Sequence, residues 1–177
     1  MLILNRKTDR PATDRVALAY DERKRSRLRV TLASGAEAGI FLARGDHLRG
    51  GDRLLAEDGG SVVAIDAAPE QLIEALADGA LLFARAAYHL GNRHVPVQIV
   101  PAPDGAAGGR LRFQTDHVLA EMTRGLGCTV TPCTAPFEPE SGAYAGTHRH
   151  VAGDDALHDP GHGPHGAVPK IHQFKPG

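Results

Sequence analysis

Histidine is the residue type whose number and spacing most clearly suggest chemistry in this sequence. Six of the ten histidines lie in the last thirty residues, at His148, His150, His158, His162, His165 and His172. Neutral imidazole is a common ligand of nickel, copper, zinc and cobalt ions. The residues between these histidines are rich in Gly, Pro and Asp, so the segment cannot build a packed pocket, but it can wrap several imidazoles around one ion. The pattern therefore predicts a protein that handles transition metals.

A histidine in the middle of the sequence holds a second promising position. His94 lies in the run YHLGNRHVPVQ, just after the expected end of a helix and just before a strand that carries Pro96. Rigid neighbours would position its imidazole while leaving it in solvent, which suits a metal ligand. The alternative is a histidine that only complements the helix dipole. His89 and His94 are five residues apart, about 500° around a helix, so they do not chelate from one face. One chain therefore does not complete a site here.

The elements that must position His94 follow from the spacing of apolar residues. A helix is expected over 79–92, capped by Asp78 and stopped by Gly91-Asn92. A second helix is expected after a cap at Thr115 or Asp116, with an apolar face formed by Val118, Leu119, Met122 and Leu126. Strands are expected at 95–100, 110–114 and 128–132. Residues 71–77 fit a strand or a helix, and if they form a strand the order is β-α-β-β-α-β, that of a ferredoxin-like fold.

The N-terminal part has a different character. Short β-prone runs at 27–32, 38–43, 53–57 and 61–67 are separated by glycine-rich turns, which is typical of a small barrel or sandwich rather than a parallel sheet. Pro69 marks the change of pattern. The expected fold class is thus α+β, with a small all-β domain over 1–69, a ferredoxin-like domain over 70–144 and a flexible His-rich tail over 145–177. Disorder without metal is expected for that tail, although the apolar residues of 168–174 could dock.

Charge is unevenly distributed, although the formal net charge is only −1, which argues against a nucleic-acid or membrane surface spread over the molecule. Twelve of the twenty Lys and Arg residues lie in residues 1–53. Five of them form a basic run at Arg23, Lys24, Arg25, Arg27 and Arg29. The simpler interpretation is a solvated strand edge, since charges keep edges from aggregating. The sharper one is a surface for an acidic protein partner.

The remaining signals concern location. No apolar stretch reaches the roughly 18 residues that span a bilayer, and the start MLILNRKTDR does not read as a signal peptide, so a cytoplasmic protein is expected. In a reducing compartment Cys128 and Cys133 are most simply free thiols, with a metal or redox pair as the alternative.

Several segments together resemble the urease accessory nickel metallochaperone family, UreE. They are YDERKRSRLRVTL at 20–32, RGDHLRGGDRL at 44–54, VVAIDAAPE at 62–70, YHLGNRHVPVQI at 88–99, DHVLAEM at 116–122 and PFEPESGAYAGTHRH at 136–150. These segments cover most of residues 15–150 in the right order, so the combination is far more specific than a histidine count.

The resemblance implies roles for particular residues. His94 corresponds to the central metal ligand of the family, supplied by both subunits of a homodimer, and His117 corresponds to a more peripheral ligand. The histidines of the tail correspond to the variable His-rich end. Thr115 stands where some relatives carry another histidine, so a paired peripheral site is not implied. The implied cargo is Ni²⁺, and Zn²⁺ and Cu²⁺ could also bind in vitro. The implied partners are urease apoprotein and its accessory complex, including a GTPase.

Two rival interpretations remain. A general nickel, copper or zinc buffer would use the same histidines without a dedicated client. An enzyme is not expected, because the sequence contains no GxxxxGK[ST], HExxH or GxSxG motif. A metal-dependent hydrolase built on His94 and His117 is the remaining enzymatic alternative. Glu138 and Glu140 stand between prolines and are expected in an extended, solvated segment rather than in a catalytic pair.

Overall fold

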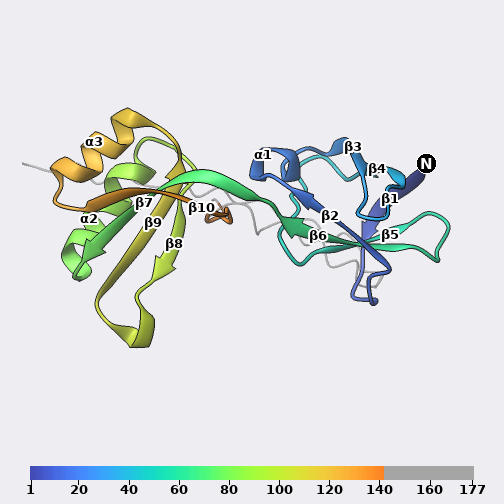
Figure 1. Ribbon diagram of the computed structural model, residues 1–177, viewed down its shortest axis with the longest axis horizontal. Coiled ribbons are helices and arrows are strands. Elements are labelled where there is room, and N and C mark those ends of the chain that lie inside the picture. The colour runs from blue at the N-terminus through green and yellow to red at the C-terminus, as the bar shows by residue number, and fades with distance from the viewer. Residues whose placement is uncertain (142–177) are drawn as a thin grey trace, which may run out of the picture. The chain divides into compact units, whose positions relative to one another are not determined.

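The computed structural model describes residues 1–141. The expectations for the His-rich tail, including its disorder, its six histidines and the docking of 168–174, lie outside these residues. Within them the chain forms two sheets in succession, with element order β1 to β6 in the first and β7 to β10 in the second (Figure 1). Every helix in this part of the chain is too short or too polar to cross a membrane.

The first sheet has six strands in the order β2-β6-β5-β1-β4-β3. Their bounds are β1 Leu2–Lys7, β2 Asp14–Leu18, β3 Arg27–Thr31, β4 Glu37–Phe41, β5 Arg53–Ala56 and β6 Val62–Ala67. The four strands expected from the sequence are confirmed, each within two residues. The sheet is mixed, however, because β1 pairs with β4 and β2 pairs with β6 in parallel. Strands β1 and β2 and the two parallel pairings were not among the elements predicted from the sequence.

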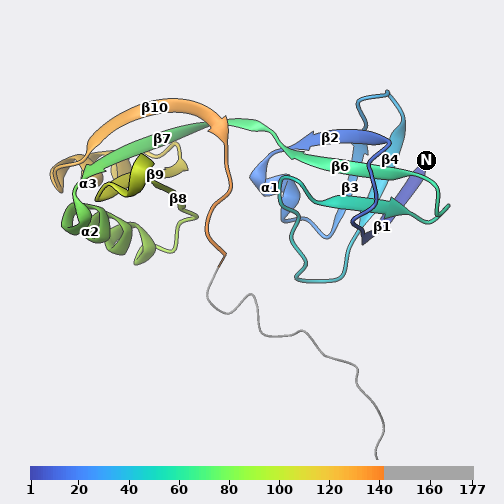
Figure 2. The same ribbon diagram turned by 90° about the horizontal axis from the view of Figure 1, so that it is seen from below.

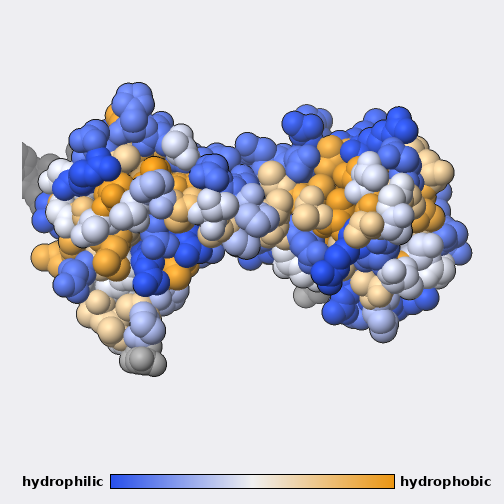
Figure 3. Space-filling model, in the orientation of Figure 1, coloured by the Kyte–Doolittle hydropathy of each residue, from blue (hydrophilic) through white to orange (hydrophobic). Residues whose placement is uncertain are grey.

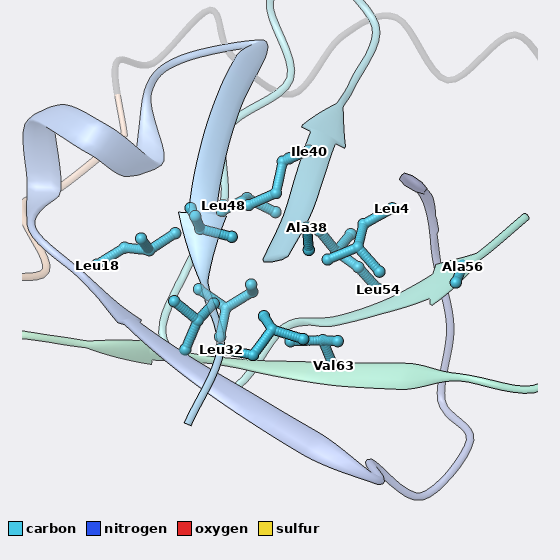
Figure 4. Packing of buried hydrophobic residues seen from close by; sticks show 12 residues of the cluster. Leu4, Leu18, Leu32, Ala38, Ile40, Leu48, Leu54, Ala56 and Val63 are labelled. Carbon is cyan, nitrogen blue, oxygen red and sulfur yellow. The ribbon is translucent and has the colours of Figure 1, made fainter. Parts of the chain in front are cut away.

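Alternating side chains of these strands fill the first core. Leu28 and Val30 on β3 point inward, whereas Arg27 and Arg29, which alternate with them, are exposed, as the period of two in a strand requires. Twelve buried residues form the cluster shown in Figure 4, among them Leu4, Ile40, Leu54 and Val63, each with no exposed surface. This core fixes which face of β3 and β4 meets solvent.

A single helical turn, α1 (Tyr20–Arg23), connects β2 to β3. The backbone N–H of Ala19 donates to the Glu22 carboxylate at 2.8 Å, which satisfies one of the free donors at the start of the turn. Arg23 at its end is 1% exposed. The basic run is therefore not uniformly solvated, because its first member is part of the interior.

The second sheet has the order β10-β7-β9-β8, and all of its pairings are antiparallel. Its elements are β7 Pro69–Asp78, α2 Ala80–Gly91, β8 Gln98–Pro101, the 3-10 turn Pro103–Gly105, β9 Gly108–Gln114, α3 His117–Gly125 and β10 Thr129–Pro136. Residues 71–77, which the local pattern left undecided, thus lie in a strand with partners on both sides. The α+β class is confirmed by this succession of elements.

Both helices pack against one face of the second sheet (Figure 2). Ala86 and Leu90 of α2 and Leu119 of α3 meet Leu111 and Phe113 of β9 in a second buried cluster. The side chains that alternate with these on β7 and β9 lie on the other face, where Glu74 pairs with Arg112 at 2.8 Å and with Arg110 at 3.3 Å. The sheet therefore presents one apolar face to its helices, and its other face carries this ion-pair cluster between Leu72 and Leu76.

Several local expectations need correction. The α2 helix is capped by Gly79, with φ of 89° and no side-chain bond, and not by Asp78. Val118, expected on the apolar face of α3, is 52% exposed. The strand expected at 95–100 is shorter, since β8 begins at Gln98. Pro96 has no N–H to offer a ladder, which is consistent with its position just outside an edge strand.

Candidate metal site

His94 stands on a loop with a constrained backbone. The α2 helix ends at Gly91, and the N–H of His94 donates to the Gly91 carbonyl at 2.9 Å, which closes the last turn. Among residues 1–141, His94 is the one non-glycine residue with a positive φ, at 54°. Such a left-handed conformation costs about 1–3 kcal/mol for a residue with a side chain. The surrounding structure therefore fixes the backbone from which this imidazole projects, and the side chain is exposed.

Contacts on both sides hold this loop. The guanidinium of Arg93 donates to the sulfur of Met122 in α3 at 3.1 Å. On the other side the N–H of Glu140 donates to the carbonyl of Val97 at 2.9 Å, and the N–H of Glu138 donates to the side-chain oxygen of Gln98 at 3.2 Å. These bonds supply partners to residues 97 and 98 from outside the sheet. The imidazole thus lies on a supported loop and not on a free one.

His117 occupies a different element. It is the first residue of α3, directly after the cap Asp116, whose carboxylate accepts from the N–H groups of Val118 at 2.8 Å and Leu119 at 3.0 Å. The prediction that Thr115 or Asp116 caps this helix is confirmed for Asp116. The imidazole of His117 is exposed. Its placement leaves it free to act as a separate ligand position.

The described residues of one chain do not assemble a complete ligand set. Within residues 1–141 no three His, Cys, Asp or Glu side chains gather closely enough to hold an ion. His94 and His117 are each exposed, on a loop and at a helix start respectively. Cys128 and Cys133 are free, as expected, and burial raises the pKa of both thiols, which disfavours the thiolate that binds metal.

An apolar surface borders the loop of His94. A shallow groove is lined by Ala87, Gly91, Val95, Pro96, Val97, Ile99 and Glu140. Tyr88 on α2 is 65% exposed and Ile99 on β8 is 40% exposed. Figure 3 shows apolar surface in the region of α2. This surface was not predicted from the sequence, although Tyr88 and Ile99 are the first and last residues of the run YHLGNRHVPVQI around His94.

The segment that follows β10 is a second feature that was not predicted from the sequence. We call residues 137–141 the strap. Glu138, expected in a solvated segment, instead accepts from the Arg23 guanidinium at 2.6 Å and from the N–H of Gly50 at 2.7 Å. Phe137 is fully buried and packs edge-on against the ring of Tyr20, with centroids 5.3 Å apart. Only Glu140 and Ser141 of the strap are exposed.

Two family models match the chain, one for each sheet. The N-terminal domain of the UreE urease accessory protein matches residues 2–68, and the C-terminal domain of the same protein matches residues 70–168. The class of protein is therefore an accessory chaperone with two domains, and not an enzyme.

Curated relatives carry the same name. A urease accessory protein UreE of Dechloromonas aromatica is 73% identical over 179 residues, covering 99% of each chain. A UreE of Pseudomonas putida strain F1 is 51% identical over 148 residues, covering 81% of this chain and 84% of its own. One of Teredinibacter turnerae is 49% identical over 138 residues, covering 78% and 84% respectively. This chain belongs to the UreE family of urease accessory proteins, which confirms the resemblance seen in its sequence.

Proposed function

We propose that this protein is a nickel metallochaperone, which delivers Ni²⁺ to urease apoprotein during assembly of the urease metal centre. Membership of the UreE family supports a role in urease assembly. The observation that supports a metal site at His94 is its exposed side chain, on a residue held in a left-handed conformation in a loop that has contacts on both sides. Strained backbone of this kind clusters at functional sites such as ligand clamps.

We propose that two copies of the chain associate so that their His94 imidazoles share one ion. The apolar groove beside His94, with exposed Tyr88 and Ile99, offers a surface for that contact. A two-fold axis brings the same residue from both subunits together. Two imidazoles leave the other coordination positions open, and open positions allow the ion to be released to an acceptor.

The other histidines have supporting roles in this proposal. His117 serves as a peripheral ligand, and His148, His150, His158, His162, His165 and His172 of the His-rich tail recruit or shield the ion. A flexible tether of this kind acts at an effective concentration of the order of mM. The partners are urease apoprotein and its accessory complex, including the urease accessory GTPase, and the location is the cytoplasm.

The domain organisation is part of the same proposal. Residues 1–69 form a partner-binding domain, 70–144 a metal-binding and dimerisation domain, and 145–177 the His-rich tail. We assign the second domain to the ferredoxin-like fold. The element order β-α-β-β-α-β and the sheet order β10-β7-β9-β8 support this assignment.

The experiment is a nickel titration by calorimetry combined with mass measurement. His94→Asn removes the imidazole and retains a residue that tolerates the left-handed conformation. We expect it to lose the tightest site, one ion per two chains. His89→Asn, at another exposed histidine of the same region, is the matched control and should bind as the unmodified chain does. Full-affinity binding by the His94 variant would contradict the proposal.

Truncation after Tyr144 tests the tail separately. It should lower the number of ions bound and retain the tightest site. A general metal buffer remains the second candidate, because the histidine-rich end of the sequence suits storage as well as delivery. Urease activation at limiting nickel, measured in cells with and without this protein, distinguishes the two functions. Loss of activation without the protein, at normal urease expression, supports the chaperone. Unchanged activation with altered metal tolerance supports the buffer.

A further inference from the structure

The first sheet carries an exposed surface that the metal site does not use. On β3, Arg27 and Arg29 point away from the core, and the register places Arg27 opposite Phe41 and Arg29 opposite Gly39 of β4. On the other side of β4, Gly39 lies opposite Ile3 of β1. We call the surface formed by Ile3, Arg27, Arg29, Gly39 and Phe41 the outer face.

The outer face has an apolar floor. Phe41 is 41% exposed, and Met1 beside it is 73% exposed. A Cβ atom built on Gly39 would lie 2.7 Å from the ring of Phe41 and 3.6 Å from the methyl carbon of Met1. The absence of a side chain at Gly39 therefore lets the aromatic ring lie directly on the sheet. Large apolar side chains gathered at a surface, rather than scattered singly, are typical of interaction sites.

Positive charge surrounds this floor. Arg29 pairs with Glu37 at 2.8 Å, and a bond from Thr31 also engages that carboxylate. By contrast, Arg27 and the neighbouring Arg25 are exposed and take part in none of the ion pairs within residues 1–141, and Asp21, the carboxylate that interacts with Arg25 at longer range, is paired with Lys24. The local charge is thus positive even though the whole chain carries a formal charge of −1. An exposed aromatic ring next to unpaired arginines is the combination that protein interfaces favour at their centres.

We propose that the outer face docks an acidic segment of a protein partner in urease activation, with Arg25 and Arg27 facing its carboxylates and Phe41 covered by one of its apolar side chains. This inference rests on the proposed function, since it assigns a surface to the partner of that function. A second copy of this chain does not fit the same surface. A two-fold contact would place like charges opposite each other.

The test measures binding of the full chain to purified urease apoprotein and to the purified accessory GTPase, each immobilised, at low and high NaCl. Arg27→Glu should weaken binding to one of the two at least about tenfold at low salt, mainly through a slower association rate, and the difference should shrink at high salt. Arg27→Lys should bind nearly as the unmodified chain does. Arg85→Glu reverses another exposed arginine, on α2, and should have no such effect.

Phe41→Ser should weaken the same interaction mainly through faster dissociation. Leu81→Ser is its control, since Leu81 is 74% exposed on α2. The nickel stoichiometry of every variant should equal that of the unmodified chain, which separates this surface from the metal site. Equal effects of Arg27→Glu and Arg85→Glu, or unchanged binding of Arg27→Glu to both proteins, would overturn the inference and leave the nickel proposal standing. If the unmodified chain itself does not bind nickel, the proposed function is refuted instead.

Discussion

Arg23 and Lys24 are adjacent basic residues whose substitution should have very different effects on stability. Both form an ion pair at 2.6 Å, Arg23 with Glu138 and Lys24 with Asp21. The side chain of Arg23 is 1% exposed, whereas that of Lys24 is 39% exposed. We therefore compare Arg23→Met with Lys24→Met, which remove the same charge and leave an apolar stem of similar length.

The expected magnitude follows from the contacts of the guanidinium. Arg23 donates to the Glu138 carboxylate and to the carbonyls of Leu18 and Phe137. A hydrogen bond to a charged group contributes about 1.5–3 kcal/mol, and each bond to a carbonyl about 1 kcal/mol. Because Glu138 is 33% exposed and can be rehydrated, we take the lower part of this range. Arg23→Met should reduce the free energy of unfolding by about 3.5 kcal/mol, and Lys24→Met by less than about 1 kcal/mol, as for other exposed pairs.

Urea denaturation followed by circular dichroism measures both variants. With a slope of about 1–3 kcal/mol per molar urea, a loss of about 3.5 kcal/mol moves the midpoint by about 1–3.5 M. Glu138→Gln should fall between the two variants, because the amide oxygen still accepts a bond from Arg23. Equal midpoints for Arg23→Met and Lys24→Met would refute the assignment of Arg23 as a buried anchor of the strap.

Three other predictions concern single contacts. Asp116→Ala should destabilise the protein by about 1 kcal/mol and Asp116→Asn by much less, measured by urea denaturation, because the asparagine oxygen can still cap α3. Iodoacetamide should modify Cys133 before Cys128 in a mass-spectrometric time course, because Cys128 is buried, at 5% exposure, whereas Cys133 is partly exposed. Ser34→Ala should raise the pKa of Asp14 in an NMR titration, because the Ser34 hydroxyl lowers the pKa of that carboxyl. The stabilisation from a lowered pKa is present above the unfolded pKa of about 3.9 and is lost as pH falls through the folded pKa. The free energy of unfolding of Ser34→Ala should therefore decrease less on acidification than that of the unmodified chain.

The helices and most strands could be predicted because their signals are local. The apolar period of α2 and the cap of α3 lie within the elements themselves, and both helices form where expected. Residues 71–77 could not be assigned, since their Leu, Glu and Ala residues are good helix formers. Pairing with β9 on one side and β10 on the other overrides that propensity.

The candidate site was predictable in part for the same reason. The position of His94 after a helix follows from sequence, but its positive φ depends on how α2 ends and on the contacts that hold the loop. Arg23 and Glu138 lie 115 positions apart, so no local pattern could pair them. Arg23 also begins a run of basic residues whose other members are exposed, so the sequence gives no local signal that Arg23 is buried.

The position of β1 in the first sheet has a consequence for biosynthesis. Although β1 is translated before the other strands of this sheet, it lies between β4 and β5 in the finished sheet, with Leu2 opposite Ala38 and Leu4 opposite Ala56. Its backbone N–H and C=O groups therefore have no strand partners until β4 and β5 have been translated. Such distant pairing slows folding and leaves a nascent apolar strand open to aggregation or to capture by general chaperones.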